Sequence, residues 1–262
     1  MMPLSPHANK EILLRAVEEL LNNYDVKPSF FGTNEFANCF LNGVMLFDIA
    51  ESLQEPGIWK KKKNKPERPP IDYGSRIANV SKKLGLGYVV LSSPYINGLK
   101  DGGASYLAHY VRQFKKENPE TIIETTIPFE LSSNHLTFLL KEKPDVVSFK
   151  IIYDRKGKGR LRRLLRAIET VRKVSREKPI RVILSINEKT RPSEIFGVLR
   201  AIRKSGADMV VLQTSKTENQ INEDIFEAYA REAYNLGFKH VVSKPKPNVA
   251  CLLYTSPSPR DS

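Results

Sequence analysis

The stretch LGLGYVVLSSPYINGLKDGGA, residues Leu84–Ala104, decides the fold of this chain. Its apolar run Tyr88–Leu91 is short, rich in valine and flanked by polar residues and glycine, as is typical of a buried parallel strand. The turn Asp101–Gly103 follows this run and opens a segment in which apolar residues recur at three- and four-residue steps. These residues are Leu107, Tyr110, Val111 and Phe114. The stretch therefore predicts a strand followed by a helix, the repeating unit of an α/β fold.

The same alternation continues on both sides of this stretch. Further short apolar runs are Val44–Ile49, Ile122–Ile127, Asp145–Ile152, Ile180–Ile186 and Met209–Leu212. Helical segments are expected at Leu161–Val171, Ser193–Lys204 and Asn222–Leu236, with Ser193 as an N-cap and Gly237 as the C′ glycine. About six βα units follow, which favours a partial, open (βα)6 barrel. Periodicity alone does not separate such a barrel from a doubly wound sheet.

The chain divides into three parts. Residues 1–43 form an N-terminal helical extension, in which Ala8–Leu21 is an amphipathic helix. Residues 44–250 form the barrel. The linker Lys60–Pro70 is too polar and proline-rich to pack, so we expect a surface loop at one barrel mouth. Residues 251–262, CLLYTSPSPRDS, resemble a translated sequencing adaptor, although a natural Ser/Pro tail would have the same composition, and they are left out of the fold.

Composition limits the class of protein. The chain has 262 residues, 40% of them hydrophobic, so it can bury a full core. No apolar run approaches the roughly 20 residues that span a bilayer, and the N-terminus lacks an apolar signal core. We therefore expect a cytoplasmic protein that does not bind membranes. The two cysteines, Cys39 and Cys251, exclude a disulfide framework and a four-cysteine metal site.

The formal net charge is +13, and much of the basic character lies in two clusters, Lys60–Lys65 and Arg155–Arg163. Such clusters can meet nucleic acid, anionic lipid or an acidic protein, or can be simple solvated surface. Neither zinc-finger spacing nor an RNP-type aromatic strand is present, so nucleic acid is the less favoured partner.

Two segments resemble lipoyl synthase, a family of radical S-adenosylmethionine enzymes that insert sulfur into octanoyl chains. Leu84–Ala104 is similar to the family's LG-x-x-YVVLTS and LPDGGA segments, and Leu236–Pro245 is similar to its MGFKHVASGP segment. The resemblance covers roughly residues 35–250. It implies a partial (βα)6 TIM-like barrel of the radical-SAM type.

The resemblance also implies iron–sulfur clusters and S-adenosylmethionine as cofactors, but the cluster ligands are missing. The family's C-x3-C-x2-C motif falls at Gln54, Ile58 and Lys61, and its auxiliary C-x4-C-x5-C motif falls at Pro28, Thr33 and Cys39. A [4Fe–4S] cluster is held by thiolates, which are soft and anionic. Amide, alkyl and ammonium groups do not replace them. We therefore expect a degenerate member without clusters, catalytic residues or a metal.

Asp101, Gly102 and Gly103 are the candidate cofactor-binding residues, because the N–H groups of a strand-to-helix turn can hold a small anion or an amino-acid head group. In the alternative, Asp101 caps the following helix. Cys39 is either a reactive thiol or a buried, inert one. His109, His135 and His240 lack metal-like spacing.

The leading hypothesis is a non-catalytic, lipoyl-synthase-like paralogue that binds a partner or ligand in lipoate metabolism. An acidic lipoyl carrier domain or H-protein is the expected partner, docked through Lys60–Lys65. Whether the chain is an enzyme stays open at this point. One alternative is a cluster-free enzyme with different chemistry at the barrel mouth, for which the residues to inspect are Glu124, Lys150, Tyr153 and Gln213. Another is a lipoyl synthase active through unrecognised ligands.

Overall fold

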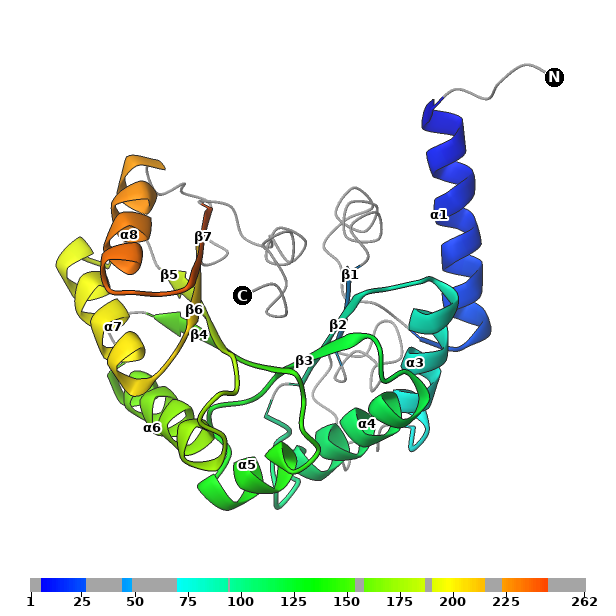
Figure 1. Cartoon of the computed structure of the whole chain (residues 1–262), viewed down its shortest axis with the longest axis horizontal. Helices are drawn as coiled ribbons and strands as arrows, with labels where there is room; N and C mark the ends of the chain where they lie inside the picture. Colours follow the sequence, from blue (N-terminus) through cyan, green and yellow to red (C-terminus); the bar gives the residue numbers. More distant parts are fainter. Residues whose placement is uncertain are drawn as a thin grey trace.

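The computed structural model describes residues 6–26, 44–48, 70–93, 95–153, 158–186, 190–214 and 223–244. Within them, one parallel sheet of seven strands runs in the order β1 to β7, and each strand pairs with its neighbours in the chain. Figure 1 shows this sheet as a curved half-barrel with α3 to α8 along its convex side.

The strands are β1 Val44–Asp48, β2 Tyr88–Ser92, β3 Ile122–Thr126, β4 Val146–Tyr153, β5 Ile180–Ile186, β6 Met209–Thr214 and β7 His240–Lys244. The helices are α1 Pro6–Asn23, α3 Tyr73–Lys83, α4 Ala104–Glu117, α5 Ser133–Leu140, α6 Lys158–Val174, α7 Pro192–Ser205 and α8 Glu223–Asn235. No helix within the described ranges combines the length and the apolar character that crossing a bilayer requires.

The core lies between the sheet and the helices. Alternate strand residues point to opposite faces, and those on the helix-facing side are buried in one apolar cluster with the helices, as Val89, Leu91 and Phe149 illustrate. Residues one position away, such as Val90 and Ser148, lie outside that cluster. Membership of the apolar cluster therefore alternates along these strands and distinguishes the face under the helices from the inner face, although many residues on both faces are buried.

The expected α/β barrel-type architecture is confirmed. Each of the expected apolar runs forms a strand, and the sequential strand order distinguishes the sheet from a doubly wound one, whose order reverses at a switch point. The described elements form six βα units, from β1–α3 to β6–α8, as expected, and β7 adds a seventh strand to the sheet. This strand begins at His240, three residues after Gly237. Gly237 has the predicted left-handed conformation, with a φ of 83°.

Some helix predictions were incomplete or wrong. Neither α3 nor α5 was expected, because α3 carries glycine and serine within its sequence and α5 has only eight residues. The N-cap of α7 is Arg191 rather than Ser193. The helix begins at Pro192, whose fixed φ suits the first helical position.

The N-terminal helix packs against the barrel through α3. Val17 and Leu21 of α1 are buried in the common core, as expected for the apolar side of an amphipathic helix. Beyond α1, Asp25 pairs with Arg76 at 3.0 Å, and the Lys83 ammonium lies 4.9 Å from the centre of the Tyr24 ring. The predicted linker Lys60–Pro70 falls outside the described residues except for Pro70, and so does the 251–262 tail.

Two glycines in helices give opposite predictions for the free energy of unfolding. A Cβ at Gly74 would lie 2.6 Å from the Tyr110 carbonyl oxygen, so we expect Gly74→Ala to separate α3 from α4 and lower stability by about 1–3 kcal/mol. A Cβ at Gly197 meets nothing within 4 Å, so Gly197→Ala should raise stability by about 0.5–1 kcal/mol. Urea unfolding followed by circular dichroism measures both. Destabilisation of equal size at the two positions would contradict this account of α3–α4 packing.

Candidate functional site on the inner face of the sheet

The inner face of the sheet is polar near its centre, in contrast to the face under the helices. Its polar side chains are Tyr88, Ser92, Glu124, Thr126, Ser148, Lys150, Arg181, Ser185 and Gln213. Because all strands are parallel, their carboxyl ends meet at one edge, which is where barrels of this architecture place their binding sites.

An ion pair lies on the inner face near the amino ends of the strands. Arg181 contacts Glu124 Oε2 at 2.5 Å, and the two side chains are 7% and 0% exposed. The Tyr88 hydroxyl donates to the same oxygen at 2.5 Å, while an Nη of Arg181 lies 3.8 Å from Met209 Sδ. Glu124 Oε1 has no hydrogen-bond partner among the described residues. Burial of this pair makes either side chain costly to remove alone.

Neutral hydrogen-bonding groups occupy the middle of the face. The hydroxyls of Thr126 and Ser148 lie 2.8 Å apart, and Gln213 donates to the Ser185 hydroxyl at 2.9 Å. Farther along β4, Lys150 and Ile152 are exposed. Hydroxyl and amide groups of this kind can orient a polar ligand. Within the described ranges, no group of three His, Cys, Asp or Glu side chains could hold a metal ion.

The residues named for cluster-free chemistry do not converge. Glu124 forms an ion pair with Arg181 near the amino ends of the strands, and Gln213 donates a hydrogen bond to Ser185 on β5. Tyr153 belongs to the apolar cluster on the helix-facing side, because it is an odd number of positions from Lys150 along β4. The expected shared pocket of these side chains is therefore not formed.

The Asp101–Gly103 turn lies at the carboxyl edge of the sheet and is closed by its own hydrogen bonds. Asp101 accepts from the N–H groups of Gly103 at 3.1 Å and Ser105 at 2.8 Å. The N–H of Gly102 donates to the Leu99 carbonyl, and that of Ala104 donates to the Asp101 carbonyl. The structure thus shows the capping contacts of the alternative reading. The role of this turn in holding a ligand stays a prediction.

Glycine is required at the two positions after Asp101. Gly102 and Gly103 have φ values of 61° and 94°, which L side chains rarely adopt. A Cβ at Gly102 would also lie 2.4 Å from the ring of Tyr95. The DGG signal therefore reflects a tight turn between β2 and α4.

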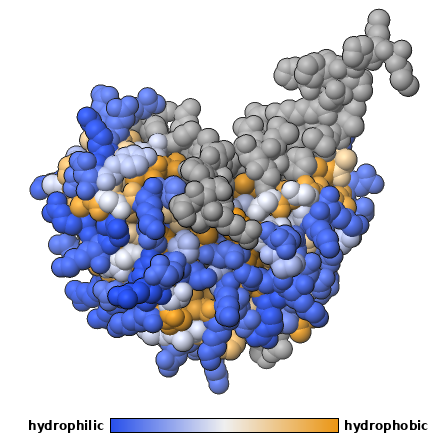
Figure 2. Space-filling view, viewed as in Figure 1, coloured by the Kyte–Doolittle hydropathy of each residue, from blue (hydrophilic) through white to orange (hydrophobic). Residues whose placement is uncertain are grey.

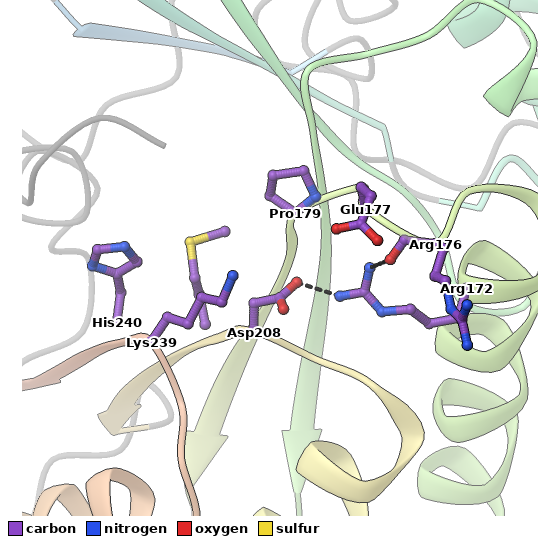
Figure 3. A pocket seen from close by; sticks show the side chains of 8 residues that line it. Arg172, Arg176, Glu177, Pro179, Asp208, Lys239 and His240 are labelled. Carbon is purple, nitrogen blue, oxygen red and sulfur yellow. Dashed lines mark hydrogen bonds and ion pairs between the residues drawn. The ribbon is translucent and has the colours of Figure 1, made fainter. Parts of the chain in front are cut away.

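The opposite edge of the sheet carries a pocket of about 150 Å³, whose walls include Pro179, Met209 and His240. Figure 3 shows Arg172 and Asp208 on one side of it, joined by an ion pair. Arg172 also donates to the carbonyls of Gly206, Arg176 and Lys178 at 2.7–2.8 Å, and Asp208 accepts from the Ile180 N–H. These contacts fasten α6 to the starts of β5 and β6, a role in stability that is typical of this edge.

The remaining predicted site residues are dispersed or lie outside the described part. Pro28, Thr33, Cys39, Gln54, Ile58 and Lys61, together with the Lys60–Lys65 run, fall in ranges that the structure does not describe. His109, on α4, lies 3.0 Å from the Ile71 carbonyl, whereas His135 is on α5 and His240 begins β7. The structure does not bring the three histidines together.

Fold and site together define a barrel-type α/β protein whose inner face bears hydrogen-bonding side chains. No family model matches the chain. It is 30% identical over 199 residues to the lipoyl synthase of Caldicellulosiruptor saccharolyticus, covering 70% of each chain, and 29% identical over 195 residues to that of Aquifex aeolicus, covering 69% of each. The chain belongs to the lipoyl synthase family. Among solved structures, it is similar to QR15, an aldolase, with a TM-score of 0.43 and 9% identity, covering 66% of this chain and 84% of that one.

The Asp101 cap gives a pH-dependent prediction. Partial burial pushes the pKa of Asp101 upward, but hydrogen bonds from Ser105 and Gly103 together outweigh it and hold the pKa below its usual value. The unfolded chain then binds more protons, so the contribution of this carboxylate is present above pH 4 and is lost as pH falls through the lowered pKa. We expect Asp101→Ala to cost about 0.5–2 kcal/mol at pH 7. Urea unfolding at pH 7 and in strong acid should show a smaller difference between variant and wild type in acid.

The buried ion pair gives a second prediction. Glu124→Gln removes the carboxylate that Arg181 contacts while the guanidinium stays buried, so we expect a loss of about 3–5 kcal/mol in the free energy of unfolding. The double variant Glu124→Leu/Arg181→Met removes both charges and should recover most of that loss. A double-mutant cycle by urea unfolding, with Glu124→Leu and Arg181→Met also made singly, tests the coupling, and additive effects of the two substitutions would contradict it.

Proposed function

We propose that this member of the lipoyl synthase family is a non-catalytic paralogue that binds a partner or ligand in lipoate metabolism, in the cytoplasm. One observation carries the proposal. The whole sequence contains two cysteines, Cys39 and Cys251, and the positions that match the family's radical-SAM cysteines hold Gln54, Ile58 and Lys61.

The available donors do not fit an iron–sulfur cluster. The radical-SAM cluster needs three thiolates and leaves one iron open for the cofactor. Two cysteines cannot supply three thiolates, and the auxiliary cluster would need three more. Hydroxyls, an amide and an already paired carboxylate on the inner face are hard or neutral ligands, which do not favour iron held with sulfide. We therefore derive no reaction step through the cluster or through S-adenosylmethionine.

The inner face can bind a polar ligand without thiolates. The inner face keeps hydrogen-bonding pairs, Thr126 with Ser148 and Gln213 with Ser185, that can orient a polar ligand. The formal net charge of +13 favours an acidic partner by long-range attraction. An acidic lipoyl carrier domain or H-protein, the partner expected from the family resemblance, has the complementary charge.

The decisive experiment measures the iron content of the purified 262-residue chain. The chain is expressed without oxygen and reconstituted with ferrous iron and sulfide beside the Aquifex aeolicus lipoyl synthase as a procedural control. We expect a folded, colourless protein without stoichiometric iron and without release of 5′-deoxyadenosine from S-adenosylmethionine. Stoichiometric iron with a cluster spectrum and cleavage of S-adenosylmethionine would show instead a lipoyl synthase active through unrecognised ligands.

A further inference from the structure

The first half of α6 carries an unusual concentration of positive charge. Its cationic residues are Lys158, Arg160, Arg162, Arg163 and Arg166, and the first turn contains no acidic residue. The amino end of a helix bears a partial positive charge, so cations there are unfavourable. By contrast, α3, α4 and α7 place pairs of basic residues in their last turns, where the helix dipole favours them. The dipole therefore does not account for the basic start of α6.

Three of the arginines in this half of α6 have no anionic partner among the described residues. Arg162, Arg163 and Arg166 are exposed, and none of their guanidinium groups has an ion pair or hydrogen bond within the described residues. Elsewhere on the same helix, Arg172 is fully engaged with Asp208 and three carbonyls. On α4, Arg112 pairs with Glu142. The described part of the chain thus offers no counter-charge to these three arginines.

The position of α6 presents this charge at the functional edge of the sheet. Leu164, Ile168 and Val171 hold the helix against the core. Because α6 follows β4 in the chain, its first turns begin near the carboxyl end of β4, where Lys150 and Ile152 are exposed on the inner face. Figure 1 shows α6 on the outer side, between α5 and α7, and the corresponding outer region in Figure 2 is largely hydrophilic. A partner on this surface would lie beside the opening of the inner face.

We propose that Arg162, Arg163 and Arg166, the α6 arginine surface, dock a protein whose own surface is rich in carboxylates. The inference rests on the partner-binding function proposed above and assigns it to described residues. Guanidinium groups match carboxylates in paired hydrogen bonds. The surface spans about 6 Å along the helix axis, at roughly 1.5 Å per residue. That length is short for tracking a nucleic-acid backbone, and α6 has no aromatic side chain for base stacking.

Exposed charges of this kind act mainly on the rate of association and its salt dependence. The test uses the full chain and an unmodified recombinant lipoyl carrier domain as the acidic probe, with binding measured by surface plasmon resonance at several salt concentrations. We expect Arg162→Glu/Arg163→Glu/Arg166→Glu to slow association about 10-fold or more at low salt and to flatten its salt dependence.

A matched control reverses the same number of charges elsewhere. Lys82, Lys116 and Lys204 are exposed in the last turns of α3, α4 and α7, so Lys82→Glu/Lys116→Glu/Lys204→Glu changes net charge equally without touching α6. Circular dichroism confirms the folding of both variants. The proposal is supported if the control associates with the carrier domain at the wild-type rate while the α6 variant associates more slowly.

Several outcomes would overturn the assignment. The first is an equal reduction of the association rate in both variants, and the second is an unchanged association rate in the α6 variant. The third is that the wild type does not bind the carrier domain. The fourth is that α6 selectively binds duplex DNA or anionic vesicles instead. Iron reconstitution tests the proposed loss of catalysis independently, because its result does not depend on the partner. If the protein holds no iron and the α6 substitutions do not change binding, the non-catalytic proposal stands and the α6 docking surface is wrong.

Discussion

A parallel sheet covered by helices on one face imposes a strict alternation on every strand, and the rest of this structure depends on it. Every second side chain of a strand points toward the helices and must be apolar to pack beneath them, as Val89 and Leu91 do. The side chains between them point to the inner face and can be polar, as Glu124, Thr126 and Ser148 are. Parallel order also gathers every strand's carboxyl end at one edge. Packing and binding are thus assigned to different surfaces of the same strands.

The described barrel is stabilised by interactions that need no metal ligand. The contacts that stabilise the described barrel are apolar burial, the Arg172–Asp208 clamp at one edge and the Arg181–Glu124 pair inside. None of them uses a thiolate. These interactions therefore do not require cysteine at the positions that match the family's cluster motifs.

Much of the fold could be predicted from local sequence, because short valine- and isoleucine-rich runs and 3.6-residue periodicity are local signals. The failures have equally local causes. The helix α5 has only eight residues, so it gives a weak pattern that tertiary packing completes. The start of α7 was misplaced by two residues, because Pro192 can occupy the first helical position and Arg191 caps it without a side-chain hydrogen bond.

The sequence by itself determined the number of cysteines and their positions, because a count of residues needs no coordinates. It also determined the alternation of strands and helices. Only the tertiary structure decided which polar residues meet. Glu124 and Arg181 are 57 residues apart and pair through sheet register, and Tyr153 turns toward the helices while Lys150 faces inward. The physical reason is that composition and periodicity are properties of neighbours in the chain, whereas partners across a sheet are set by register and curvature.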